Sequence, residues 1–208
     1  MDVEVLGRQA LPHMAVSGGR VARTRQSIVS AALSLAATGE VAPIVRDIAR
    51  MAGVSARTVF QHFADTAELY VAVLDRVLTT EFGALAEPSV TLSREGRIQL
   101  VVEQRAERFE RLLPMWTFVE TLQRRSEPAA AMIARVYAAN EANLARWFDR
   151  ELAGLSAEPR ARLLNALSLA LSPESWVVLR LRQGMPVERA RDQLQFVMTA
   201  ALGGPTRG

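Results

Sequence analysis

Apolar residues recur along this chain with the three- to four-residue spacing of α-helices. Near the start, the apolar positions of one such face are Ile28, Ala31, Ala32, Leu35 and Ala36. They predict a first helix near residues 23–38, which Gly39 would end. No stretch shows the alternation of apolar and polar residues that is typical of a half-buried strand. The pattern therefore predicts an all-α fold.

Two short helices separated by a glycine follow the first. The apolar face of the second helix consists of Ile44, Ile48 and Ala52. Pro43 suits its first turn, where a missing N–H costs nothing, and Gly53 ends it. The third helix begins after Ser55, a favourable N-cap residue, and presents Val59 and Phe63 inward. This arrangement predicts a helix-turn-helix over residues 44–63.

Further helices are predicted along the rest of the chain. The run Asp65-Thr66-Ala67-Glu68 has the form of a capping box and starts a fourth helix that extends to about Phe82. After Glu87-Pro88, helical patterns are separated by residues that break helices. They cover Arg94 to Phe109, Met115 to Leu122, Ile133 to Phe148, Leu163 through Trp176 to about Arg182, and Val187 to Ala201.

Cationic charge is unevenly distributed along the chain. All 25 basic residues are Arg, and the net charge is +3. Residues 20–63 contain six Arg against Glu40 and Asp47, whereas residues 64–208 contain 18 Arg and 18 acidic residues. A local excess of cations is expected of a surface that binds phosphates, and a solvated helix face is the alternative explanation.

The helix-turn-helix has small residues where its geometry requires them. Ala49 lies where the two helices cross, and Gly53 lies in the turn, while Ile48, Val54 and Val59 fill the wedge between the helices. A bulky residue at 49 would push the helices apart, and a Cβ at 53 would strain the turn. Any two packed helices joined by a glycine turn could share some of these features by chance, but five matches at fixed offsets argue against it.

The segment VRDIARMAGVSARTVFQHFADTAELY at 45–70, together with the preceding helix and Gly39, resembles the DNA-binding domain of the TetR family of bacterial regulators. The resemblance implies an N-terminal three-helix helix-turn-helix domain and a C-terminal helical bundle that binds a small ligand and pairs two subunits. The last segment, SPESWVVLRLRQGMPVERARDQL, resembles the dimerising end of that family.

This resemblance also implies a set of residues at the DNA, because the recognition helix of such proteins lies in the major groove. The set is Arg46, Ser55, Ala56, Arg57, Thr58, Phe60, Gln61, His62 and Thr66. Arg46 and Arg57 can pair with guanine or with phosphates, and Gln61 can read adenine. Ser55 and Thr58 are better suited to phosphates than to bases. His62 has two interpretations, a DNA contact or a structural histidine at the helix end.

Three positions depart from the family pattern. Phe60 replaces the usual Tyr, Thr66 replaces the usual Lys, and Pro43-Ile44 replaces the usual Ser or Thr cap of the second helix. These changes remove phosphate contacts and a cap, so they are expected to weaken DNA affinity but not the fold. Cations of the arm and first helix can compensate, namely Arg20, Arg23 and Arg25.

The C-terminal part offers bulky residues for a ligand cavity between helices. They are Phe109, Met115, Trp116, Phe118, Tyr137, Asn140, Trp147 and Trp176, with Met132 as a further apolar candidate. Aromatic residues at helical spacing are also typical of core packing, so both interpretations stand. Arg105, Asn140 and Asn143 lie on the same helices and could orient a polar group of a ligand.

Little in the composition supports an enzyme, a metal site or a bound cofactor. The chain has no Cys, and its two His lie at 13 and 62. Glu103, Glu107 and Glu110 share a helical face, but neighbouring Arg residues favour a solvated ion-pair face over catalytic carboxylates. No apolar run approaches the length of a membrane span, and the acidic start does not resemble a signal peptide, so a cytoplasmic protein is expected.

These observations predict a ligand-responsive repressor that binds double-stranded DNA as a homodimer on a pseudo-palindromic operator. The expected parts are a flexible arm (1–19), the DNA-binding domain (20–66), a connecting helix (67–87), a helical ligand-binding and dimerisation domain (88–203) and a tail (204–208). One rival is a protein of the same fold that has lost DNA binding and acts through protein contacts. A second rival is a catalytic helical bundle.

Overall fold

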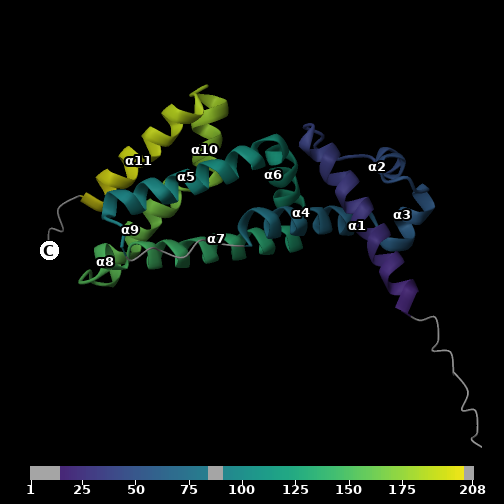
Figure 1. Ribbon diagram of the computed structural model, residues 1–208, viewed down its shortest axis with the longest axis horizontal. Coiled ribbons are helices and arrows are strands. Elements are labelled where there is room, and N and C mark those ends of the chain that lie inside the picture. Colours follow the sequence, from purple (N-terminus) through teal and green to yellow (C-terminus); the bar gives the residue numbers. More distant parts are fainter. Residues whose placement is uncertain (1–14, 84–90, 204–208) are drawn as a thin grey trace, which may run out of the picture.

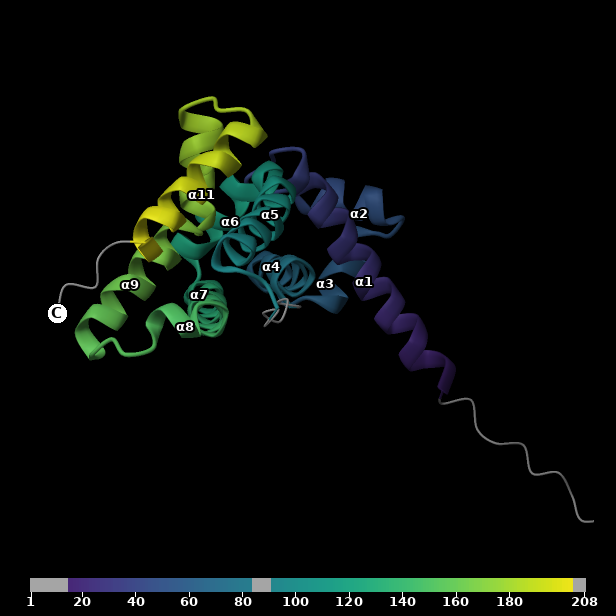
Figure 2. The same ribbon diagram turned by 60° about the vertical axis from the view of Figure 1, so that its left-hand side comes forward.

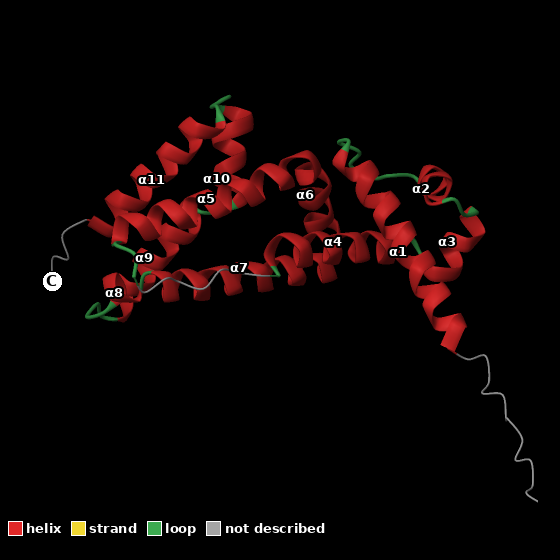
Figure 3. Cartoon of the chain, viewed as in Figure 1, coloured by secondary structure: helices red, strands yellow, loops and turns green. Residues whose placement is uncertain are grey.

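A computed structural model describes residues 15–83 and 91–203, with side chains from Gly19 onward. Regular structure in these two ranges is entirely helical, which confirms the all-α fold expected from the sequence (Figure 3). The predicted boundary near residues 87 and 88, most of the predicted arm and the predicted tail lie outside the described residues.

Four helices make up the N-terminal part of the fold. They are α1 (Ala15–Ala37), α2 (Val45–Ala52), α3 (Ala56–His62) and α4 (Thr66–Phe82). Helix α1 packs against α2, α3 and α4, so the short helices α2 and α3 rest on a longer support. Buried residues of α1, including Ile28, Ala32 and Ala36, provide the apolar face that holds them.

The remaining helices form a bundle that continues from α4. They are α5 (Arg94–Leu112), η1 (Leu113–Met115), α6 (Trp116–Arg125), α7 (Glu127–Trp147), α8 (Asp149–Leu152), α9 (Ala157–Ala170), α10 (Pro173–Val177), the π-helical turn η2 (Val178–Arg182) and α11 (Val187–Gly203). Helix α4 packs on α7, α7 packs on α9, and α11 packs on both α5 and α9.

Two predicted elements differ from the structure. Helix α1 begins at Ala15 rather than near residue 23, so the last residues of the predicted arm are helical. The helix predicted from Leu163 through Trp176 is interrupted, because Ser172 ends the run and caps α10 through a bond from the Ser175 N–H at 3.1 Å. Pro173 then occupies the first turn of α10, where it is tolerated. The apolar spacing continues across this break, which is why periodicity did not reveal it.

The elongated shape separates the N-terminal helices from the last ones. Figures 1 and 2 both place α1–α3 at one end of the molecule and α8, α9 and α11 at the other. The long helices α4, α5 and α7 lie between these ends (Figure 1). One continuous set of buried apolar residues extends from Ile28 in α1 to Leu202 in α11. A movement in the bundle can therefore reach the N-terminal helices through packed side chains.

Polar contacts fix the far part of the bundle. The Arg97 guanidinium of α5 pairs with Glu151 of α8 and donates to the Trp147 carbonyl of α7. Glu110 of α5 accepts from Trp176 Nε1 at 2.8 Å and from Arg180 Nε at 2.7 Å. These bonds hold α5 to α7, α8, α10 and η2, so α5 is tied to its surroundings near both of its ends.

Candidate nucleic-acid interface

Helices α2 and α3 are held in a helix-turn-helix by a small apolar wedge. Ile48, Ala49 and Val59 are buried between the helices, and Val54 packs against the same core. Gly53 joins them with a φ of 68°, in the left-handed region that favours glycine. The predicted role of each of these residues in the wedge and the turn is thereby confirmed.

The start of α3 is capped by its own side chains. Ser55 Oγ accepts from the Thr58 N–H at 3.0 Å, and the two hydroxyl oxygens lie 2.9 Å apart. Ser55 is exposed and Thr58 is half-buried. Both hydroxyls therefore order the first turn of the helix while Ser55 remains accessible to a partner.

The outer face of α3 presents a charged, an amide and an aromatic side chain. Arg57 and Gln61 are exposed and lie one helical turn apart, and Phe60 between them is 51% exposed. Ala56 is exposed at the start of the same helix. In the part of the chain that the structure describes, Arg57 has no ion-pair partner. The face can thus offer a free guanidinium and an amide to a ligand as large as DNA.

Arg46 at the start of α2 lies at the surface as well. Its side chain is 84% exposed, and its Nε lies 3.9 Å from Asp47. Asp47 makes a closer pair with Arg50 at 2.9 Å, which leaves Arg46 loosely held. Exposed pairs of this kind contribute little energy, so Arg46 is available for another anion.

The remaining predicted residues, His62 and Thr66, are less accessible. Both are half-buried. Thr66 begins α4 and lines a cavity of about 200 Å³ between α4 and α6, together with Tyr70 and Phe118. Its position is therefore at the junction with the bundle rather than on the outer face of α3.

The departure at Pro43-Ile44 has a visible structural counterpart. Ile44 occupies the N-cap of α2 and makes no side-chain capping bond. Pro43 is buried, and its carbonyl accepts from the Tyr70 hydroxyl at 2.7 Å. The entry to α2 is consequently anchored by α4, while the first N–H groups of α2 lack a side-chain cap.

A cation–π contact that the sequence did not reveal supports the end of α3. The Arg25 guanidinium of α1 lies 4.4 Å from the centre of the Phe63 ring and 3.7 Å from Glu68. Glu68 also accepts from the Ala64 N–H at 2.7 Å, and its own N–H donates to Asp65 at 2.8 Å. The predicted capping function of Asp65 is confirmed, and Arg25 adds a link between α1 and the start of α4.

Comparison with known families identifies this N-terminal region. Residues 28–73 match the family model described as "Bacterial regulatory proteins, tetR family". The chain carries a TetR-type DNA-binding domain. The match begins in α1, includes all of α2 and α3 and ends in α4, so it covers the elements whose packing is described above.

Solved structures share the fold of most of the chain. A Clostridium perfringens protein named as a fatty acid metabolism regulator has a TM-score of 0.56 and 18% identity, over 88% of this chain and 100% of its own. A Mesorhizobium loti protein named as a TetR-family transcriptional regulator has a TM-score of 0.51 and 20% identity, over 88% of this chain and 95% of its own. No curated protein sequence matches this chain. These neighbours support a TetR-type helix-turn-helix domain followed by a helical C-terminal domain.

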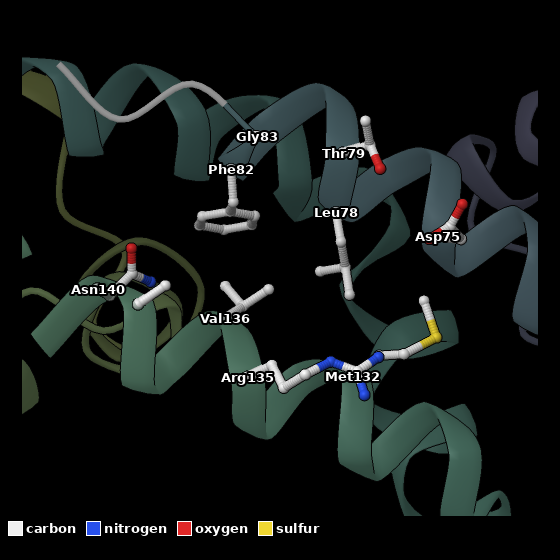
Figure 4. A pocket seen from close by; sticks show the side chains of 10 residues that line it. Asp75, Leu78, Thr79, Phe82, Gly83, Met132, Arg135, Val136 and Asn140 are labelled. Carbon is white, nitrogen blue, oxygen red and sulfur yellow. The ribbon is translucent and has the colours of Figure 1, made fainter. Parts of the chain in front are cut away.

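Next to the TetR-type domain, an open hollow of about 250 Å³ lies between α4 and α7; we call it the α4–α7 hollow. Figure 4 shows Leu78 and Phe82 of α4 and Val136 of α7 extending into the space between the two helices. Its other lining residues are Asp75, Thr79, Gly83, Met132, Arg135, Ala139 and Asn140. The TetR-type match ends within α4. One wall of this hollow is therefore formed by the helix that joins the two parts of the molecule.

A narrow cavity of about 30 Å³ lies deeper in the bundle; we call it the inner cavity. It shares Leu78, Phe82, Val136 and Asn140 with the α4–α7 hollow, so the two spaces adjoin at these side chains. Its remaining lining residues are Leu112, Trp116, Val119, Gln123, Ile133, Tyr137, Pro173 and Glu174. The walls are mainly apolar, with a few polar groups, as is typical of small-molecule sites.

The eight predicted ligand-binding residues divide into two groups. Trp116, Tyr137 and Asn140 line the inner cavity, and Phe118 lines the cavity beside Thr66. Of the others, Phe109, Trp147 and Trp176 are fully buried in the core, and Met115 packs against it. Phe109 and Trp176 contact each other, with ring centres 6.4 Å apart. Leu78 and Phe82 were missed because their apolar spacing on α4 resembles that of ordinary core residues.

Helices α9 and α11 leave large apolar residues at the surface. Leu169 of α9 is 70% exposed and Phe196 of α11 is 68% exposed, and Val197 is exposed beside Phe196. The two helices pack on each other at the end of the molecule opposite to α3 (Figure 1). In the described ranges, no helix is long and apolar enough to cross a membrane, and no group of three or more His, Cys, Asp or Glu could hold a metal ion.

Proposed function

We propose that this protein is a transcriptional regulator that binds double-stranded DNA as a homodimer and releases it when a small ligand binds the C-terminal domain. The observation that carries the proposal is the outer face of α3, where exposed Arg57 and Gln61 extend from a rigid, capped helix. A guanidinium can pair with both acceptors of a guanine edge, and an amide can pair with an adenine edge. A face of this kind fits the major groove.

Phosphate contacts are proposed to come from the start of α2 and from the cations around it. Arg46 is exposed, and the first N–H groups of α2 lack a side-chain cap. Backbone N–H groups at a helix start and arginines are both common phosphate donors. These groups offset the hydroxyl and the amine that Phe60 and Thr66 do not provide.

Dimerisation is proposed to occur through α9 and α11. Large exposed apolar residues such as Leu169 and Phe196 are unusual on a monomer when they are grouped at one end of the molecule. A second copy that covers this end would leave both α3 helices free to contact DNA. Two recognition helices on one dimer read half-sites about one helical turn apart.

The ligand response is proposed to act through α4. Helix α4 forms one wall of the α4–α7 hollow and follows α3 after only a short connection. A ligand that separates α4 from α7 would shift α3 relative to its counterpart in the dimer. Such a ligand binds the conformation that releases DNA more tightly than the conformation that binds DNA. The difference between these two binding free energies sets how far the ligand lowers the affinity for DNA.

The DNA-binding proposal is tested with purified full-length protein and DNA selected from a random duplex library. We expect the selection to yield a two-fold symmetric sequence. Its binding, measured by fluorescence anisotropy, should weaken as the salt concentration rises. Arg57→Ala and Gln61→Ala should each weaken specific binding about 10-fold or more, because each removes a base-edge contact worth about 1–3 kcal/mol. Arg124→Ala, an exposed arginine of α6, is the matched control and should leave binding unchanged.

Failure to select any sequence would overturn this proposal. It would favour the alternative of a TetR-fold protein that acts through protein contacts, to which the departures at Phe60, Thr66 and Pro43 already point. Selection of a sequence that Arg57→Ala binds as tightly as the original protein would contradict the assigned role of α3.

A further inference from the structure

Arg105, in the middle of α5, is a buried cation. Its side chain is 2% exposed, and neither Nη1 nor Nη2 has a hydrogen-bond partner among the described residues. Buried guanidinium groups are normally paired, because a charge taken out of water loses its hydration. The described residues therefore provide no anion for this guanidinium, although its burial requires one.

Arg97, two turns earlier on the same helix, shows the contrast. It is equally buried, but its guanidinium pairs with Glu151 and donates to the Trp147 carbonyl. Arg105 instead has Arg108 as its charged neighbour, and burial together with that like charge lowers the pKa of Arg105 to about 10. The guanidinium consequently stays protonated at neutral pH, and no carboxylate of the described residues pairs with it.

The position of Arg105 along the bundle follows from one hydrogen bond and one shared cavity between α5 and α7. At one end, Arg97 donates to the carbonyl of Trp147. At the other, Leu112 lines the inner cavity together with Ile133 of α7. The two helices are thus antiparallel, and Arg105, midway between Arg97 and Leu112, lies at the level of Asn140.

Asn140 is itself incompletely bonded. Its Oδ1 atom is buried and has no hydrogen-bond partner in the described part of the chain. The same residue lines both the α4–α7 hollow and the inner cavity. Asn140 thus lines both spaces at the level of Arg105. Arg105 lines neither space, but it precedes Leu112 of the inner cavity by seven residues and therefore lies on the same face of α5.

We propose that Arg105 binds the anionic headgroup of an amphiphilic ligand whose apolar part occupies the α4–α7 hollow and the inner cavity. The ligand's carboxylate or phosphate accepts two hydrogen bonds from the Arg105 guanidinium, whose Nη1 and Nη2 atoms lack partners among the described residues. Leu78, Phe82 and Val136, which line both spaces, move apart to admit the apolar chain. This inference rests on the proposed ligand-responsive function and specifies the chemical class of the ligand.

The headgroup preference is tested by calorimetric titration of the full-length protein with decanoate, decyl phosphate and decanol. The three probes carry the same apolar chain but differ in the headgroup. We expect the affinity for decanoate or decyl phosphate to be at least about tenfold higher than the affinity for decanol, because hydrogen bonds between charged groups are stronger than those of a neutral hydroxyl. Comparison of the two anions distinguishes a carboxylate ligand from a phosphate ligand. Equal binding of all three probes, or binding of none, would overturn the proposal.

The Arg105→Met variant tests whether Arg105 causes the preference for an anionic headgroup. The variant should bind decanol as the original protein does and should lose the additional affinity for the two anions. Arg94→Met is the control, because Arg94 lies on the same helix and pairs only with the adjacent Glu95 among the described residues. An Arg105→Met variant that keeps the anion preference would place the anion elsewhere and overturn the assignment.

Thermal unfolding without ligand separates a ligand-binding role from a structural one. An unpaired buried charge does not stabilise the empty protein, so Arg105→Met should unfold at the same temperature as the original protein or higher. A lower unfolding temperature would show that Arg105 has a structural partner and would contradict the proposal. The titrations contain no DNA, so their failure overturns only the ligand assignment, whereas failure to select DNA overturns only the DNA-binding proposal.

Discussion

The first turn of α3 depends on a single hydroxyl at its N-cap. Ser55 Oγ accepts from the Thr58 N–H, which would otherwise lack a partner. We expect Ser55→Ala to lower the free energy of unfolding by about 1 kcal/mol, as is typical of a lost N-cap. Urea denaturation measures this change. Ser34→Ala is the control, because Ser34 bonds only to the carbonyl of Ser30 within α1.

Residues whose role is local were predictable from the sequence, and residues with distant partners were not. The left-handed conformation of Gly53 and the caps at Ser55 and Asp65 follow from short-range backbone requirements. The stacking of Arg25 on Phe63 joins residues 38 positions apart, and no local pattern encodes it. Arg105 was recognised as a polar residue on a bundle helix, but only the packing of the helices reveals its lack of a partner.

Helices α2, α4 and α6 meet at one tyrosine. The Tyr70 hydroxyl donates to the Pro43 carbonyl ahead of α2, and its ring lies edge-on to Phe118 of α6 at 5.6 Å. Burial raises the pKa of Tyr70, so its hydroxyl keeps the proton that it donates. We expect Tyr70→Phe to keep the ring contact but to release the entry to α2, with a loss of about 1 kcal/mol in stability.

DNA affinity is the informative measurement for Tyr70→Phe. A released α2 should bind the selected DNA several-fold more weakly, because the start of α2 loses its fixed position. Ser34→Ala is the control, since the exposed Ser34 hydroxyl bonds to the Ser30 carbonyl within α1. Equal DNA affinity of Tyr70→Phe and the original protein would show that this bond does not position α2.

The attachment of α5 to α10 and η2 is expected to depend on pH. The hydrogen bond from Arg180 lowers the pKa of Glu110, and the bond from Trp176 acts in the same direction. A lowered carboxyl pKa means that the stabilisation is present above the ordinary pKa and is lost as pH falls through the lowered one. Glu110→Gln should therefore lower the unfolding free energy at pH 7 by less than about 1 kcal/mol, given partial exposure to solvent.

The measurement compares urea denaturation of Glu110→Gln and the original protein at pH 7 and at pH 3. The difference between them should shrink from pH 7 toward pH 3, because the Glu110 carboxyl resembles the amide once it is protonated. A difference of the same size at both pH values would mean that the charge of Glu110 contributes nothing to the attachment.

Long elements were predictable, and their interruptions were not. Periodicity located α4, α5, α7 and α11, because each buries one continuous apolar face. The short helix α8 was missed, and α9 and α10 were merged, because apolar residues keep their spacing across Ser172. A serine followed by proline is a helix-start signal, but it was outweighed by the surrounding apolar pattern.

At the scale of the whole molecule, the TetR-type domain and the exposed apolar helices lie at opposite ends. Helix α4 leads from α3 toward the bundle, and α7 connects the region of α4 with that of α9 (Figure 1). A ligand between α4 and α7 would therefore act between the proposed DNA-binding and dimerisation surfaces. This placement explains how a small change in the bundle could alter the separation of two recognition helices in a dimer.

The proposed dimer gives the last prediction. The substitutions Leu169→Glu and Phe196→Glu place a charge at exposed apolar residues of α9 and α11. Each should convert the protein from a dimer to a monomer, because the carboxylates of the two subunits would be buried in the interface without a cation beside them. Light scattering coupled to size-exclusion chromatography measures the mass. Val21→Glu, at an exposed apolar residue of α1, is the control and should remain dimeric.

The same variants link dimerisation to DNA binding. A monomer presents one α3 helix and contacts one half-site, so it loses the gain in affinity that comes from tethering the second. We expect the two monomeric variants to bind the selected symmetric DNA at least about 100-fold more weakly, with unchanged helical content by circular dichroism. A protein that stays dimeric with both glutamates in place would show that the subunits pair through another surface, because two buried like charges facing their own copies would not be tolerated there.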